Sequence, residues 1–219
     1  MKLRIASLVI LCLALGLPAV AQSWTYDNGP LNGTTDAWII NFGFEVSDSY
    51  VAGGSNATGF AFYVWEIEGD AVTSVYWTIT GGENSGTTFG SGTASGANLT
   101  DKFISDNQYS YAIDLITVTG LNVPELSGTT YWLNLEDATT KDHEPVYWDE
   151  NSGVGCGGLN GTKNCPSLAS ENIEGTIPSE SFTINGGGGG GGTTPEPSSI
   201  VLFGSGALGL VGALRRRLL

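Results

Sequence analysis

The sequence predicts an all-β protein: an antiparallel β-sandwich followed by a single C-terminal transmembrane helix. Two observations predict the β-sandwich. Between Trp24 and Ile184, short runs of aromatic and β-branched residues alternate with turns rich in Gly, Asn, Ser and Thr. The same region has no sustained apolar period of 3.6 residues, which an amphipathic helix would show. Seven or so strands at this spacing favour a jelly-roll-like order, with an immunoglobulin-like order as the alternative.

Each strand is predicted from its local pattern. In "SVYWTIT", Val75, Trp77 and Ile79 share one face, as in a half-buried strand. The run 58–68 is largely apolar on both faces, which predicts a strand covered on both sides. A break is expected near Gly120 in the run 108–123. The remaining predicted strands lie within 37–47, 130–138, 144–150 and 176–185.

Residues 1–21 have the three parts of a secretory signal peptide. Lys2 and Arg4 precede a short apolar core, and small residues stand at Ala19 and Ala21. This order predicts export, with cleavage between Ala21 and Gln22.

The predicted ectodomain, residues 22–185, is strongly acidic. It holds three lysines and 21 acidic residues, a net charge of −18. Nucleic-acid binding is excluded because contacts to phosphate need clustered Lys and Arg. Such a surface suits cations or neutral polymers such as polysaccharide.

Two cysteines, Cys156 and Cys165, remain after the signal peptide is removed. A close pair in an exported chain predicts a disulfide that closes a surface loop. Metal binding is the alternative, but two cysteines without neighbouring histidines do not complete a tetrahedral site. No metal is therefore assigned to them.

A glycine-rich linker, 186–194, separates the ectodomain from the tail. Gly204, Gly206 and Gly209 fit the G-x-G-x-x-G pattern, but no strand precedes them and no acidic residue follows. Dinucleotide binding is therefore rejected. The uncharged run 198–214 predicts a short transmembrane helix. The basic tail Arg215, Arg216 and Arg217 predicts a cytoplasmic end.

Residues 195–219 resemble the PEP-CTERM sorting signal of Gram-negative bacteria. The resemblance rests on Pro195, Glu196 and Pro197, on the glycine-bearing apolar run, and on the terminal arginines. It implies processing near Pro-Glu-Pro by an exosortase, a membrane cysteine protease-transpeptidase. It also implies a link to exopolysaccharide and biofilm, with the mature protein either anchored in the membrane or released to the cell surface or matrix.

The only histidine, His143, lies in the polar-aromatic segment "KDHEPVYWDEN". By residue type, Glu144 and Glu150 are candidates for the paired carboxylates of a glycosidase. A solvated acidic loop is the favoured interpretation, so no catalytic residue is predicted.

Two oxygen-rich segments could supply ligands to calcium, although neither has EF-hand spacing. Their candidate ligands are Asp27, Asn28 and Asp36 in the first, and Asp149, Glu150 and Asn151 in the second. Calcium stays an option, and no other cofactor is expected.

Three aromatic residues, Trp132, Tyr147 and Trp148, are candidates for stacking on a sugar ring. The alternative places them in the core, where Trp and Tyr bury large areas. The leading functional hypothesis is a non-enzymatic exported protein of the envelope or exopolysaccharide matrix. A carbohydrate-binding module is the second hypothesis, and a glycan-active enzyme is the third.

Overall fold

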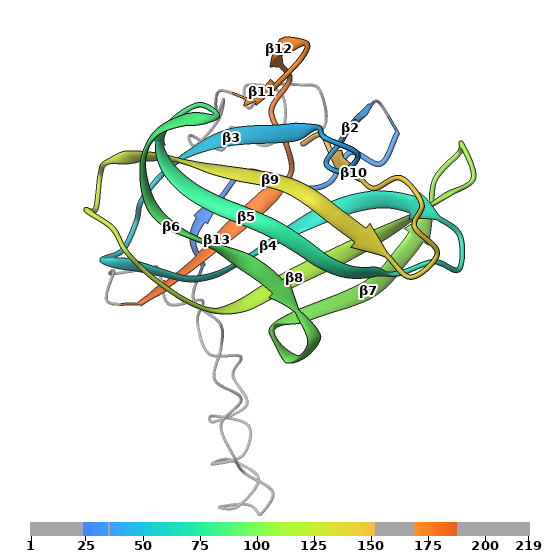
Figure 1. The fold of residues 1–219 in the computed structure, drawn as a ribbon, viewed down its shortest axis with the longest axis horizontal. Coiled ribbons are helices and arrows are strands. Elements are labelled where there is room, and N and C mark those ends of the chain that lie inside the picture. Colours follow the sequence, from blue (N-terminus) through green and yellow to red (C-terminus); the bar gives the residue numbers. More distant parts are fainter. Residues whose placement is uncertain (1–23, 35, 152–168, 188–219) are drawn as a thin grey trace, which may run out of the picture.

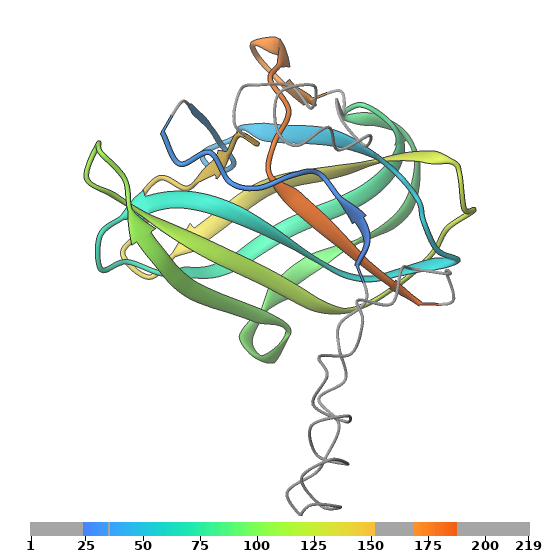
Figure 2. The same ribbon diagram turned by 180° about the vertical axis from the view of Figure 1, so that it is seen from behind.

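The computed structural model describes residues 24–34, 36–151 and 169–187, which form two antiparallel sheets in two layers (Figures 1 and 2). The all-β, two-sheet prediction is confirmed. Sheet A contains β1 (Trp24–Asp27), β2 (Ala37–Ile39), β4 (Asn56–Ile67), β7 (Leu99–Asp106), β8 (Tyr111–Pro124), β10 (Tyr147–Asp149) and β13 (Phe182–Gly187). Sheet B contains β3 (Glu45–Val51), β5 (Val72–Gly82), β6 (Ser85–Ser95), β9 (Thr130–Thr140), β11 (Ala169–Glu171) and β12 (Gly175–Ile177).

The chain passes repeatedly between the two sheets. In sheet A, β8 lies between β7 and β4, and the other edge of β4 is shared by β13 and β10. Strand β1 pairs with β13, and β2 pairs with β10. The order in sheet B is β12-β11-β3-β9-β5-β6. Strands β4 and β9 are therefore central, and their partners come from distant parts of the sequence.

The core lies between the inner faces of the sheets. Phe60 and Phe62 of β4 are fully buried, and the ring of Phe60 meets Trp77 of β5 edge-on at 6.1 Å. Val75 and Ile79 flank Trp77 in this core, as the alternation in β5 predicts.

Strand β4 is covered on both faces, which confirms the expectation for 58–68. On the face opposite Phe62, Trp65 is buried and stacks on Tyr109 with ring centroids 5.8 Å apart. Its indole Nε1 donates a hydrogen bond of 2.6 Å to Asp149. An outer layer of loop and β10 residues thus closes over the central strand.

The sequence pattern did not reveal the short strands β1 and β11 or the longer strands β6 and β7. Strand β6 is mostly exposed, and Ala94 is its only buried hydrophobic residue. Its glycines make room for the facing side chains, since a Cβ at Gly90 would lie 2.5 Å from Val123. Between β6 and β7, residues Gly96–Asn98 form a 3-10 turn, the only helical element in the described ranges. At Gly120 the backbone has φ +82°, but β8 continues through this irregularity.

Within the described residues, no helix is long and apolar enough to cross a membrane. The expected span 198–214, the signal peptide, Cys156 and Cys165 lie outside them. Strand β13 continues to Gly187, so the first two glycines of the glycine run pair with β4.

Candidate functional site

Three neighbouring strands of sheet A place Glu66, Asp101 and Asp114, the carboxylate triad, on one face. Asp114 of β8 lies opposite Val64 of β4, and Asp101 of β7 lies opposite Ile116 of β8. Paired residues project to the same side of a sheet, and so do residues two apart on one strand. The triad therefore continues the inward-facing row of β4 and β8 past the end of the apolar core.

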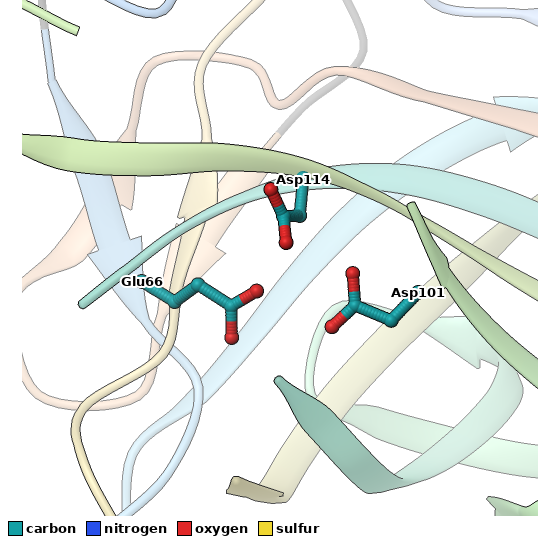
Figure 3. Close-up of side chains that lie close together, drawn as sticks. All are labelled: Glu66, Asp101 and Asp114. Carbon is teal, nitrogen blue, oxygen red and sulfur yellow. The ribbon is translucent and has the colours of Figure 1, made fainter. Parts of the chain in front are cut away.

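The three carboxyl groups converge (Figure 3). One oxygen from each lies within 4.8 Å of the others. Glu66 is 0% exposed and Asp114 is 5% exposed, whereas Asp101 is half-buried. The backbone N–H of Val72, at the start of β5, donates a 2.7 Å hydrogen bond to Oδ2 of Asp101. Sheet B thus contributes one fixed donor to the edge of the triad.

Most of the buried oxygens of the triad accept no hydrogen bond. Neither carboxyl oxygen of Glu66 has a donor, and the same holds for Oδ1 of Asp101 and Oδ1 of Asp114. The basic side chains in the described part of the chain, Lys102, Lys141 and His143, are all exposed. Within the described residues, the triad thus has one backbone donor, at Asp101, and no basic side chain to balance its charge.

Burial changes the proton affinity of two of these groups. It raises the pKa of Glu66 to about 10, and the neighbouring Asp114 and Asp101 add to this shift. Burial also raises the pKa of Asp101 to about 6, against the opposing effect of the Val72 N–H. Without another positive charge, a proton is what relieves the repulsion between these carboxylates.

The two segments that could supply calcium ligands come together elsewhere, where backbone N–H groups of the first donate to Asp149 of the second. We call the four buried acids at this place, Asp48, Asp149, Glu150 and Glu180, the hydrogen-bonded cluster. Asp149 accepts hydrogen bonds from the N–H groups of Asn32 at 2.8 Å and Gly33 at 3.0 Å, and from the Trp65 indole. Burial still raises the pKa of Asp149 to about 6. Glu150 accepts a hydrogen bond from the Trp38 indole at 3.2 Å.

Asp48 has a similar role between β3 and the segment before β13. Its Oδ2 accepts hydrogen bonds from Asn28 Nδ2 at 3.2 Å, Ser179 Oγ at 3.2 Å and Glu180 N at 2.6 Å. Asn151 in turn donates to the carbonyl of Asn28 at 2.7 Å. These polar groups join distant segments to one another.

The remaining two calcium candidates, Asp27 and Asp36, are exposed. Oδ1 of Asp27 accepts the Gly29 N–H at 2.9 Å, and Oδ1 of Asp36 accepts the Ala37 N–H at 2.9 Å. Both carboxylates therefore stabilise local turns.

Glu180 differs from its neighbours in the hydrogen-bonded cluster. It is 0% exposed, and neither of its carboxyl oxygens accepts a hydrogen bond. Burial raises its pKa well above the ordinary range, and the nearby Asp48, Glu150, Asp149 and Asp36 add to the shift. The raised pKa favours the neutral acid at Glu180.

A surface cavity of about 300 Å³ lies where β9 ends, and we call it the Phe42 cavity. Phe42 on its wall is 63% exposed. Three of its residues have left-handed backbone conformations: Phe42 (φ 58°), Asp137 (φ 48°) and His143 (φ 64°). Such conformations are costly outside glycine and concentrate at functional sites. The lining consists of Asn41, Phe42, Asp137, Ala138, Thr139, Thr140, His143 and Glu144.

The predicted sugar-stacking residues do not form one platform. Trp148 is 0% exposed and packs edge-on against Phe62 and Phe182, so neither of its faces is open to a sugar. Tyr147 is half-buried in sheet A against Tyr111, and Trp132 is half-buried in sheet B.

The two glutamates considered for catalysis lie in different surroundings. Glu144 is exposed and lines the Phe42 cavity. Glu150 is 1% exposed and belongs to the hydrogen-bonded cluster.

The carboxylate triad was missed because β7 was missed. Part of its signal was nonetheless in the sequence: Glu66 interrupts the apolar run "FAFYVWEIE", and Asp114 interrupts "AIDLI". A lone acid at an inward-facing position of a buried strand is unusual, because acidic residues are almost never fully buried unless paired.

Comparison with known proteins identifies the tail. A model of the PEP-CTERM protein-sorting motif matches residues 193–217 and confirms the resemblance seen in the sequence. No curated protein matches the chain. This motif supports an exported, cell-envelope-associated protein that is sorted through an exosortase-type system.

Proposed function

We propose that this protein is a non-enzymatic component of the cell envelope or exopolysaccharide matrix. Its β-sandwich is displayed outside the cytoplasm by the C-terminal sorting signal. The observation that carries this proposal is the sorting motif at residues 193–217. In this function the predicted helix 198–214 would anchor the chain until an exosortase-type protease acts near Pro195, Glu196 and Pro197, and residues 215–217 would remain inside.

Two features of the folded part support a structural rather than a catalytic function. Buried carboxylates such as Asp149 and Asp48 accept hydrogen bonds that join distant segments. Glu144 and Glu150, the pair considered for glycan hydrolysis, lie in different surroundings. The high acidity of the ectodomain suits a protein that stays hydrated among neutral polymers.

The test compares the full chain with a chain that lacks Ser198–Leu219, both expressed in a bacterium that has an exosortase. Deletion should move the protein from the envelope fraction to the culture medium. Replacing Pro195 and Pro197 with alanine should leave the apolar run intact but block processing. Mass spectrometry of the mature C-terminus would read this out. Unchanged location after the deletion contradicts the proposal.

A second candidate function, carbohydrate binding, is favoured by the Phe42 cavity. An exposed aromatic ring beside the exposed polar side chains of Asp137, His143 and Glu144 offers both stacking and hydrogen bonding to a sugar. The strained backbone at Phe42 holds this ring outward at an energetic cost, which a binding function would explain.

Retention on immobilised exopolysaccharide tests this second function. Phe42→Ala should lower retention, whereas Phe103→Ala removes a comparably exposed ring outside the cavity lining and should not. Equal retention of the two variants would count against binding at this cavity.

A further inference from the structure

We propose that Glu66, Asp101 and Asp114 form a binding site for a hard divalent cation, calcium in particular, inside one end of the sandwich. This site is distinct from the segments around Asp36 and Asn151 that the sequence suggested.

Among the residues that the structure describes, Glu66 has no polar neighbour other than the two carboxyl groups of Asp114 and Asp101 to compensate its burial. It is 0% exposed, and both of its carboxyl oxygens lack a hydrogen-bond donor. Its side chain extends toward Asp114 and Asp101 (Figure 3). A buried carboxylate without donors is costly, and coordination of a metal is one of the few ways to compensate it.

The spacing of the carboxyl oxygens fits one calcium ion. Two oxygens bound to one calcium ion are at most about 5 Å apart, twice the Ca–O distance of about 2.3–2.6 Å. The triad offers one oxygen from each side chain within 4.8 Å of the others. Strands β4, β8 and β7 are adjacent in one sheet, so the backbone already holds these oxygens near one another.

The ligand type and the access from solvent also fit a hard cation. Carboxylate oxygens are the ligands that hard cations prefer, and three of them provide more negative charge than a divalent ion carries. Asp101 is only half-buried, so the site can be reached from solvent on the β7 side. Calcium is favoured over magnesium because it accepts irregular carboxylate sets, whereas magnesium demands near-ideal octahedral geometry at shorter distances.

The experiment uses protein purified from cells that express the full chain and freed of metal with EDTA. Titration with Ca²⁺ alone should show one saturable site per chain. At about a hundredfold excess over Kd, the melting temperature should rise by roughly 5–10 °C above its value in EDTA. Titration with Mg²⁺ alone should show weaker binding.

Variants assign the site. Glu66→Gln and Asp101→Asn keep the side-chain shape and should each weaken Ca²⁺ binding by at least about tenfold, the lower limit for losing even an outer-shell partner. The amide oxygen of Asp101→Asn can still accept the Val72 N–H. This variant therefore provides a second measurement of Ca²⁺ binding if Glu66→Gln does not fold. Glu83→Gln, at an exposed turn outside the triad, is the matched loss of charge and should bind as the original chain does.

Two results would overturn the inference. One is the absence of saturable Ca²⁺ binding, with equal melting temperatures in Ca²⁺ and EDTA. The other is Ca²⁺ binding that survives both Glu66→Gln and Asp101→Asn. Tighter binding of Mg²⁺ than of Ca²⁺ would overturn the assignment to calcium.

Discussion

Asp149 of β10 and Glu66 of the neighbouring strand β4 are both buried acids, yet their surroundings differ. Asp149 accepts hydrogen bonds from two backbone N–H groups and from the Trp65 indole. Glu66 accepts none. The difference comes from their neighbours: a loop covers Asp149 and points two backbone N–H groups at it, whereas Glu66 faces two other carboxyl groups from paired strands.

This comparison shows that acidic residues in a sequence have several structural roles. The calcium candidates Asp149 and Glu150 accept hydrogen bonds that fasten the fold. The buried carboxyl groups that lack hydrogen-bond donors include Glu66 and Asp114, in strands β4 and β8 whose sequence pattern predicted only an apolar core. The supply of donors, rather than the number of acids, separates the two roles.

The largest effect is expected from Asp149→Ala. The substitution leaves the buried Gly33 N–H and the Trp65 indole without their acceptor, so the free energy of unfolding should fall by about 3 kcal/mol or more. Urea denaturation measures this change. Asp149→Asn keeps one acceptor oxygen and should lose less. If Asp149→Ala were as stable as the original chain, the hydrogen bonds to Asp149 would not stabilise the fold, and Asp149 would not differ from Glu66 in this respect.

Glu66→Gln should have the opposite sign when divalent cations are removed with EDTA. At neutral pH the folded chain holds a proton on Glu66, whose pKa is raised to about 10, whereas the unfolded chain releases it. The amide is neutral in both states and can donate to Asp114 or Asp101, so folding no longer requires this proton. The free energy of unfolding at pH 7 should therefore rise by about 1–3 kcal/mol. Urea denaturation in EDTA tests this. A loss of stability would show that the carboxyl group of Glu66 is already satisfied.

The pH dependence of stability tests Glu180. Its pKa is raised above the ordinary 4.5, so the folded chain keeps a proton that the unfolded chain releases. The resulting stability is fully present below about pH 4.5 and is lost as pH rises, by at most about 1.4 kcal/mol per pH unit. Glu180→Gln should flatten this decline between about pH 5 and pH 8. An unchanged slope would mean that Glu180 does not hold its proton.

The smallest effect is expected from Glu83→Gln. Glu83 is exposed in the turn between β5 and β6, so its loss should change the free energy of unfolding by less than about 0.5 kcal/mol. The same denaturation series measures it. If Glu83→Gln changed the free energy of unfolding as much as Glu66→Gln does, the effect of Glu66→Gln would come from the net charge of the protein and not from the triad.

Local pattern predicted the strands that bury a regular apolar face. Val75, Trp77 and Ile79 show the required alternation, and the doubly apolar run of β4 correctly indicated cover on both sides. Strand β6 escaped because its Gly, Ser and Thr residues resemble a loop, and glycines such as Gly90 are there to admit side chains of another strand.

The triad depends on strand pairing, which local pattern does not encode. Glu66 and Asp114 are 48 positions apart and meet only because β4 pairs with β8. The order of strands in each sheet is set by packing across the whole sandwich. The tail was predictable for the opposite reason, because its order of motif, apolar run and arginines is read along a single short segment.

Strand β13 is the last element of the sandwich before the segment that carries the sorting motif. It is paired on one side with β1 and on the other with β4. Oδ1 of Asn56 accepts the Gly187 N–H at 3.1 Å, and Ser55 Oγ donates to the Gly187 carbonyl at 3.0 Å. Tension applied at Gly187 would therefore have to break hydrogen bonds to both neighbouring strands before β13 could leave the sheet.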